Sequence, residues 1–344
     1  MCMGRIFTNR VEVAALIEGF EGYLARDRSH GTVQKYLGVL RPFGRAFPGQ
    51  RIHQISAADI DSYLNEWARE FEREYGRRPK PVTVRNQVSA LKAFYTYLDR
   101  FDYLIDARGR TVRNPMLKVD LPARACKPIN WLKPAEDAAL LACAGSESEK
   151  IVVWLLRHTG IRVSEARSLR IGDFDLQPGH ERLYIRESKT PSGVRVIPIA
   201  PELVPRVQQW LDYLRRNKLY HPEAPFLSTK NGTAMQPTYV WRLVKRMAER
   251  AQVQIVPCTC NSKRSGVHSQ TCRRSTSGEN RSEVTPHTLR RTFASSLYNN
   301  DLPLDRISRL LGHSSTRVTE EAYAALAPEK LEEEFRNVLR RRAA

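Results

Sequence analysis

An aperiodic stretch at residues 106–130 divides the chain into two regions. The stretch holds three prolines and six basic residues, and its apolar residues follow neither a helical nor a strand period. Segments of this kind connect domains, and 344 residues suffice for two hydrophobic cores. We predict a first domain over 9–105, a basic linker over 106–130 and a second domain over 131–344.

Four stripes of apolar residues occupy the first region. Their spacing of three and four residues is that of one face of an α-helix. Ser56 precedes the third stripe, and Asp59 follows at the position of a capping box. The stripes include Val13, Leu16, Phe20 and Leu24; Val33, Leu37 and Leu40; Ile60, Leu64, Trp67 and Phe71; and Val84, Val88, Leu91, Phe94 and Leu98. We therefore predict a small four-helix domain whose aromatic residues lie in its core.

The second region mixes the two periods. An apolar helix over 151–158 stops at Gly160, a suitable C-cap. Alternating runs over 182–187 and 194–199 predict two strands, joined by a connection that contains Lys189. Further helical patterns cover 202–217, 238–252, 286–300, 303–311 and 315–326. The predicted fold class is mostly α with a small antiparallel β-sheet.

Charge indicates the kind of partner. The formal net charge is +19, with +6 in residues 1–120 and +13 in the remainder, so both regions are basic. A basic protein of this kind favours a polyanion, since neutralising phosphates drives nucleic-acid binding. No apolar run reaches the roughly 20 residues of a membrane span, and the first ten residues lack the apolar stretch of a signal peptide. We expect a cytoplasmic, DNA-associated protein with no membrane contact.

Several cationic residues stand in defined local contexts in the second region. Arg162 follows a glycine turn at the start of a predicted helix, where guanidinium and helix N-terminus together favour phosphate. Glu165, three residues on, can face back and orient it. His287 and Arg290 share one face of a helix because their spacing is i, i+3. His313 follows the glycine that closes another helix. Each match is an ordinary surface or packing feature when taken alone.

Lys189 and Tyr323 extend this series. A lysine in a hairpin connection is commonly solvent-exposed, but it can also swing into a groove and protonate a leaving oxygen. A helical tyrosine between alanines commonly packs, but it is also a potential nucleophile. Fixed cations stabilise the charge that builds up when a phosphodiester is attacked. We find no carboxylate cluster suited to a divalent ion and no glycine-rich nucleotide loop, so we expect no cofactor.

Taken in order, these residues resemble the tyrosine recombinase (phage integrase) family, and the resemblance covers nearly the whole chain. It implies a SAM-like core-binding domain over 9–105 and a catalytic domain over 131–344, which together form a C-shaped clamp on double-stranded DNA. It also implies that Arg162 and Arg290 bind the non-bridging oxygens of the scissile phosphate. His313 would form a further hydrogen bond to that phosphate.

The resemblance assigns the remaining roles as well. Tyr323 would attack to give a 3′-phosphotyrosyl link and a free 5′-hydroxyl. Lys189 would be the general acid toward the 5′ oxygen, His287 would assist proton transfer, and Glu165 would support the site. The covalent link stores the bond energy, so rejoining needs neither metal nor ATP. A homotetramer on two sites would exchange strands through a Holliday junction, in DNA integration or excision.

The sequence departs from the family pattern in two terminal features. The interval from His313 to Tyr323 is one residue longer than in many members, and Ala322 holds the shorter position. Few residues precede the first helix, which indicates a simple form without an arm-binding domain. A final amphipathic helix around Leu331–Leu339 docks either on a neighbouring protomer or on its own domain, and the sequence does not decide between them.

A third departure is an insertion at about 257–284. Its spacing C-x-C-x(7)-H-x(3)-C offers four ligands of the kinds that tetrahedral zinc accepts, but C-x-C is not the usual zinc-finger spacing. The alternative, which we prefer, is a basic loop that contacts DNA without metal. The candidate zinc ligands are Cys258, Cys260, His268 and Cys272, and the candidate DNA contacts of the loop are Lys263, Arg264, Arg273 and Arg274.

Basic residues of the linker are a second set of candidate DNA contacts, with a merely solvated linker as the alternative. They are Arg108, Arg110, Arg113 and Lys118. Three other functions compete with recombination. A type IB-like topoisomerase or a telomere resolvase would share the chemistry. A non-catalytic DNA-binding accessory protein would keep the fold but lose at least one catalytic residue. A zinc-dependent binding module would centre on the insertion.

Overall fold

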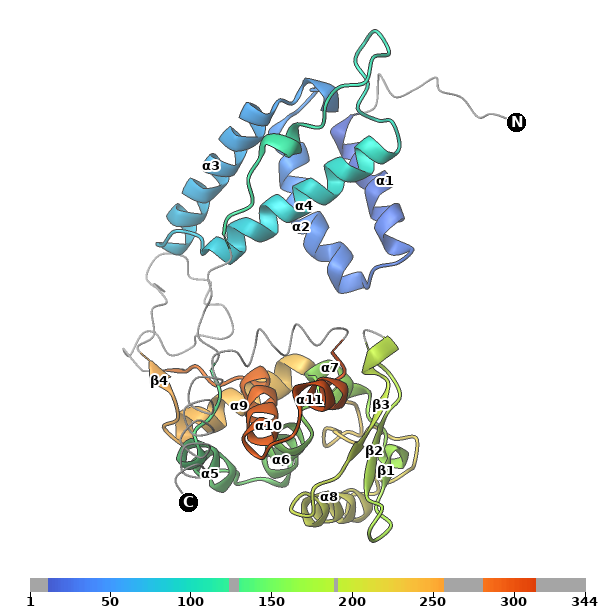
Figure 1. Ribbon diagram of the computed structural model, residues 1–344, viewed down its shortest axis with the longest axis vertical. Coiled ribbons are helices and arrows are strands. Elements are labelled where there is room, and N and C mark those ends of the chain that lie inside the picture. Colours follow the sequence, from blue (N-terminus) through green and yellow to red (C-terminus); the bar gives the residue numbers. More distant parts are fainter. Residues whose placement is uncertain (1–11, 124–129, 189–190, 257–280, 314–344) are drawn as a thin grey trace, which may run out of the picture. The chain divides into compact units, whose positions relative to one another are not determined.

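The computed structural model describes residues 12–123, 130–188, 191–256 and 281–313 (Figure 1). The chain forms two compact units, which meet in sequence between Lys127 and Pro128. We refer to the described residues before that point as the N-terminal unit and to those after it as the C-terminal unit. Most described residues are helical and the sheets are small and antiparallel, which confirms the predicted fold class.

The N-terminal unit contains the four predicted helices. They are α1 (Val13–Ala25), α2 (His30–Ala46), α3 (Ala57–Tyr75) and α4 (Pro81–Arg100). The capping box read from the sequence begins α3: the Ser56 hydroxyl accepts from the Asp59 amide at 3.2 Å, and the Asp59 carboxylate accepts from the Ser56 amide at 2.8 Å. These bonds satisfy amides that the first turn of a helix otherwise leaves unpaired.

Aromatic side chains fill much of the core of this unit, as predicted. Phe20, Phe43 and Phe94 are fully buried; Phe20 packs on Phe94 in a tilted arrangement, and Phe43 contacts Tyr95 edge-on. The aromatic stripe of α3 differs from the prediction, because only its first half packs on the core. Phe71 is half-buried and Tyr75 is exposed, since the last turns of α3 extend beyond its buried residues.

Part of the stretch read as a linker folds onto the N-terminal unit. Met116, in the 3₁₀ turn Pro115–Lys118, and Val119 are buried in the same core as the helices. Asn114 caps that turn by accepting from the Met116 amide at 3.0 Å. The four basic side chains proposed to contact DNA remain exposed on this segment. They are Arg108, Arg110, which pairs with Asp106, Arg113 and Lys118.

The C-terminal unit contains seven described helices and two small sheets. The helices are α5 (Pro134–Ala142), α6 (Glu147–Thr159), α7 (Val163–Ser168), α8 (Val204–Arg216), α9 (Pro237–Arg250), α10 (Pro286–Asn299) and α11 (Leu304–Leu311). One sheet has the order β1 (Phe174–Asp175), β2 (Arg182–Ile185) and β3 (Arg195–Pro198), and the other pairs β4 (Ile255–Val256) with β5 (Arg281–Ser282). Sequence patterns missed α5, in which Leu140 is the only buried residue, and the two-residue strands, which are too short to show a period.

The apolar helix α6 is central to this unit. Its Val152, Leu155 and Leu156 side chains are fully buried, and α6 contacts α8, α9 and α10 (Figure 1). The predicted hairpin is present, with Leu183 opposite Ile197 on the buried face. This burial of apolar area holds α6 in place, and the candidate site begins where the helix ends. In the described part of the chain, no helix combines the length and apolar character that crossing a bilayer requires.

Candidate active site

The site begins at a glycine that ends α6. Gly160 has φ +61°, a left-handed conformation that closes the helix. A Cβ at this position would lie 2.4 Å from Cδ1 of Phe293, so no other residue fits without movement. The close approach of α6 and α10 brings the Gly160 carbonyl to Arg290, whose Nη1 donates to it at 2.6 Å. The end of α6 therefore anchors one of the arginines singled out in the sequence.

Arg162 lies two residues further on and begins α7 as its N-cap. Glu165 faces back toward it, as the three-residue spacing suggested. One carboxylate oxygen accepts from the Arg162 amide at 2.9 Å, and the other accepts from Arg162 Nη1 at 2.6 Å. Because both ends of Arg162 are held by one carboxylate, the guanidinium has a fixed direction. Its side chain keeps 32% of its surface exposed, so it remains accessible to a ligand.

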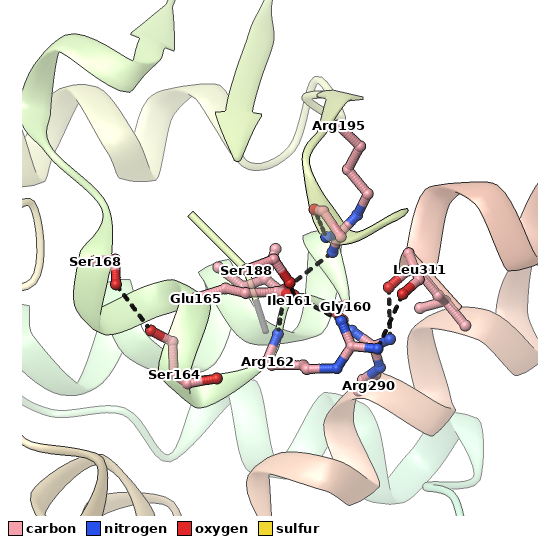
Figure 2. Close-up of polar contacts among 12 residues, drawn as sticks. Gly160, Ile161, Arg162, Ser164, Glu165, Ser168, Ser188, Arg195, Arg290 and Leu311 are labelled. Atoms are coloured by element: carbon pink, nitrogen blue, oxygen red, sulfur yellow. Dashed lines mark hydrogen bonds and ion pairs between the residues drawn. The ribbon is translucent and has the colours of Figure 1, made fainter. Parts of the chain in front are cut away.

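Glu165 is a buried carboxylate surrounded by donors. It also accepts from the Ser188 hydroxyl at 2.9 Å and from Arg195 Nη2 at 3.1 Å (Figure 2). Burial alone would raise the pKa of this carboxyl, but donation from Arg195 and from the Arg162 amide and side chain outweighs burial and lowers the pKa to about 2. Glu165 is therefore an anion at neutral pH, held between two guanidiniums.

Three arginines donate hydrogen bonds to the C-terminal end of α11. Its carbonyls at positions 310, 311 and 312 accept from Arg195 Nε at 2.6 Å, from Arg290 Nη2 at 2.6 Å and from Arg162 Nη2 at 3.0 Å, respectively. The last carbonyls of a helix have no partners within the helix and carry partial negative charge, so cations stabilise them. Three guanidiniums thus hold the end of α11 in place, and His313 directly follows that end in the chain.

Two histidines lie beside these guanidiniums. His287 lies in the first turn of α10 and keeps exposed surface although its ring is partly covered by protein, whereas His313 is half-buried. Surrounding protein, followed by the charges of Arg291, Arg290 and Arg162, lowers the pKa of His287 to about 4. Burial, followed by the charges of Arg290, Arg162, His287 and Arg195, lowers the pKa of His313 to about 4. Both imidazoles are therefore neutral near pH 7 and can donate or accept a hydrogen bond.

The structure thus brings together Arg162, Glu165, His287, Arg290 and His313. Lys189 and Tyr323 lie outside the described residues. So do the candidate zinc ligands Cys258, Cys260, His268 and Cys272, the loop residues Lys263, Arg264, Arg273 and Arg274, and the helices predicted over 315–326 and around 331–339. Within the described ranges, no three His, Cys, Asp or Glu side chains form a group that could hold a metal ion.

Sequence reasoning missed Arg195 and Ser188. A signal for Arg195 was present, because strand alternation places it on the same face as Ile197, which is buried. A basic residue on the inward face of a strand needs partners, and here it finds Glu165 and two backbone carbonyls. Ser188 follows the predicted strand without any such signal. Its contact with Glu165 depends on how the hairpin packs.

Replacing Glu165 by glutamine is expected to destabilise the C-terminal unit. The substitution leaves two guanidiniums without their carboxylate, which costs about 3 kcal/mol for a buried pair. The folded-state pKa lies below the ordinary value of 4.5, so this stabilisation is complete above pH 4.5 and is lost as pH falls toward 2. Urea unfolding at pH 7 and at pH 3 measures it. The difference between the variant and the native protein should shrink at the lower pH.

The control for this experiment is the exposed Glu187 on the same hairpin, whose replacement by glutamine should change the free energy of unfolding by less than about 0.5 kcal/mol. If Glu165→Gln unfolds at the same urea concentration as the native protein, the carboxylate is not essential to the arginine cluster.

Two models of domain families match this chain. Residues 130–330 match the model of the phage integrase family, and residues 17–101 match that of the phage integrase N-terminal SAM-like domain. A tyrosine recombinase of Thermosipho africanus is 24% identical over 309 residues, which cover 88% of this chain and 93% of that protein.

Two solved structures have the same fold. The Tn1549 transposon integrase in complex with transposon right end DNA has a TM-score of 0.66 at 21% identity, and the match covers 94% of this chain and all of that one, at 100%. A lambda integrase tetramer bound to a Holliday junction has a TM-score of 0.65 at 17% identity, covering 91% of this chain and 78% of that one. At these identities the likeness shows the fold alone.

Proposed function

The chain belongs to the phage integrase family, and we propose that it is a site-specific tyrosine recombinase that cleaves and rejoins double-stranded DNA. The observation that carries this proposal is the arginine cluster at the end of α11. Three guanidiniums and one carboxylate leave two positive charges there, next to two neutral histidines. A phosphodiester carries one negative charge, and attack on it builds a second, so the cluster suits the transition state.

In this proposal Arg162 and Arg290 bind the non-bridging oxygens of the scissile phosphate. Their backbone and carboxylate contacts hold both guanidiniums before the substrate arrives, which is the preorganisation that electrostatic catalysis needs. A guanidinium has five donors, so it can contact protein and phosphate together. His313 donates a hydrogen bond to the same phosphate, and Glu165 holds Arg162 in place.

The covalent step uses Tyr323 and Lys189, whose roles we infer from the sequence. The Tyr323 oxygen forms a bond to phosphorus and the bond from phosphorus to the 5′ oxygen breaks, giving a 3′-phosphotyrosyl link. Lys189 gives its proton to the departing 5′ oxygen, and His287 assists the transfer of the proton that the Tyr323 hydroxyl loses. A 5′-hydroxyl from a second duplex then attacks the link, which restores the phosphodiester and releases the tyrosine. The bond is conserved throughout, so no ATP and no metal are consumed.

Strand exchange joins two DNA sites, so several protomers must assemble on them. We propose that the region 9–105 is a core-binding domain, that residues 131–344 form the catalytic domain, and that both hold DNA in the cytoplasm. Four protomers would exchange strands through a Holliday junction. The fold shared with a lambda integrase tetramer on such a junction supports this assembly. The segment around Leu331–Leu339 would dock on a neighbouring protomer.

Basic residues outside the catalytic cluster would contact the DNA backbone. This role rests on exposure and charge for the linker residues and on charge alone for the insertion. They are Arg108, Arg110, Arg113 and Lys118 in the linker, and Lys263, Arg264, Arg273 and Arg274 in the insertion.

Covalent trapping tests the proposed function. Nicked suicide duplexes are made from the DNA that flanks the gene, so that the short 5′-hydroxyl fragment diffuses away after cleavage. We expect an SDS-resistant adduct between protein and DNA, formed equally well with a chelator present. Intact duplexes, which rejoin, are the control and should give far less adduct. Joint products between two duplexes would then distinguish strand exchange from relaxation of one supercoiled duplex. Tight binding of the flanking DNA with no adduct on any duplex would contradict the proposal and indicate a binding protein.

A further inference from the structure

We propose that Arg195 is a positioning residue that fixes the β2–β3 connection against the end of α11, and so places the general acid of that connection at the scissile phosphate. The inference rests on the proposed function. Arg195 lies at the start of β3, immediately after the connection in which Lys189 is found. All three guanidinium nitrogens of Arg195 donate to protein acceptors, so we place this side chain outside the pair that binds phosphate.

Arg195 joins three separate elements with one side chain. Its Nη1 donates to the Gly193 carbonyl in the connection at 2.6 Å, and its Nε donates to the Leu310 carbonyl in α11 at 2.6 Å. Its Nη2 donates to Glu165 in α7 at 3.1 Å (Figure 2). The side chain is only 7% exposed, so these contacts are shielded from water and are stronger than at a surface.

The connection and the helix end also touch directly. Gly312 has φ +64°, and a Cβ on it would lie 2.9 Å from the Gly193 Cα and 3.0 Å from the Ser192 carbonyl oxygen. The same Cβ would lie 2.9 Å from Arg195 Nη1. The backbone of the connection therefore packs on the backbone of the helix end, with the guanidinium beside both. Any shift of one element must move the other.

The chemistry of the guanidinium explains why this position holds arginine. Burying a charge is costly unless donors and acceptors match, and here one planar group meets two carbonyls and one carboxylate. Lysine carries a single nitrogen and cannot reach acceptors on three elements at once. The hairpin alone would not need a buried cation here, because an apolar side chain could pack on this face of β3, as Ile197 does. The contacts of Arg195 instead relate the connection to the arginine cluster.

A proton donor must be placed closely to act. A displacement of about 1 Å can reduce a rate by roughly 10²-fold. Lys189 is four residues before Gly193 in the same connection. Loss of the Arg195 contacts should therefore weaken protonation of the 5′ oxygen, while Arg162 and Arg290 keep their other anchors. This predicts a defect in one chemical step with DNA binding retained.

A sulfur substitution isolates that step. In a duplex with a 5′-bridging phosphorothiolate at the cleavage site, the leaving group is a thiolate, which departs without a proton. The probe is the suicide duplex that gives the adduct with the native protein, made with oxygen and with sulfur. We expect Arg195→Lys to slow single-turnover cleavage of the oxygen duplex by about 10²-fold. The rate on the sulfur duplex should return to near the native value.

Controls separate this role from a structural one. Lys189→Ala should give the same pattern of loss and rescue. Arg182→Lys, an exposed arginine on β2, should leave both rates unchanged. Thermal unfolding and DNA affinity are measured for each variant. If Arg195→Lys does not fold, Arg195→Gln, which keeps a shorter donor at the same position, is measured in the same way and should show the same rescue by sulfur.

Two results would overturn the inference while leaving the proposed function intact. One is native cleavage of the oxygen duplex by folded Arg195→Lys. The other is an equal loss on both duplexes, which would show that Arg195 serves phosphate binding rather than the connection. Absence of any adduct with the native protein on either duplex would instead overturn the proposed function, and this inference with it.

Discussion

Replacing Tyr323 by phenylalanine is expected to abolish the covalent adduct. The substitution removes one oxygen, the atom proposed to attack phosphorus, and keeps the ring. Cleavage of suicide duplexes should therefore fall by more than about 10⁴-fold, as when a nucleophile is removed. DNA affinity and thermal stability should stay within experimental error of the native values. Denaturing gels of the trapping reaction, together with a binding titration on the same duplex, measure both quantities.

The matched control is Tyr298→Phe, which makes the same change at a described tyrosine in α10. This variant should form the adduct at close to the native rate. An adduct that persists in Tyr323→Phe and disappears in another tyrosine variant would move the nucleophile to that residue. Because the interval from His313 to Tyr323 is longer than in many family members, this experiment also tests the assignment at its most unusual point.

Replacing Arg290 by lysine should reduce both cleavage and stability. Arg290 is 3% exposed and donates to the Gly160 and Leu311 carbonyls at 2.6 Å each. Lysine keeps the charge but cannot reach both carbonyls and a phosphate, so at least one buried acceptor loses its donor, at about 1–3 kcal/mol. Loss of an aimed donor to the transition state reduces cleavage by roughly 10²–10³-fold. Single-turnover cleavage and urea unfolding report the two effects separately.

The comparison variant is Arg306→Lys on the exposed face of α11, which should change neither quantity. A further variant separates the effect of losing hydrogen bonds at Arg290 from the effect of losing its charge. A second substitution, Arg290→Gln, restores part of the hydrogen bonding without the charge. Its cleavage rate should be at least as low as that of the lysine variant. Native cleavage by Arg290→Lys would contradict a phosphate-binding role for this guanidinium.

Local features of the site were readable from the sequence. The spacing of Arg162 and Glu165 predicted that the carboxylate faces back, and at the start of α7 the carboxylate does accept from the Arg162 amide and guanidinium. Gly160 and Gly312 were recognised as helix ends, and both have positive φ. Such features depend on hydrogen bonds within one or two helical turns. A few neighbouring residues therefore encode them.

Long-range features of the site were not readable in this way. Arg162 and the Gly312 carbonyl are 150 residues apart, and no pattern in the chain indicates their contact. The same holds for Arg195, whose three acceptors lie on the hairpin connection, α7 and α11. The sequence also did not indicate that part of the predicted linker packs on the N-terminal unit, where Met116 and Val119 are buried in the core.

Sequence patterns were enough to predict the mostly helical fold class, the four N-terminal helices, the hairpin and the family resemblance of the site residues. These follow from apolar periodicity, caps and turns, which act over a few residues. The packing of the folded chain was needed to see that three guanidiniums meet at the end of α11 and that Arg195 is one of them. That meeting depends on how α6, α10, α11 and the hairpin pack around a common core, and packing is a property of distant residues together.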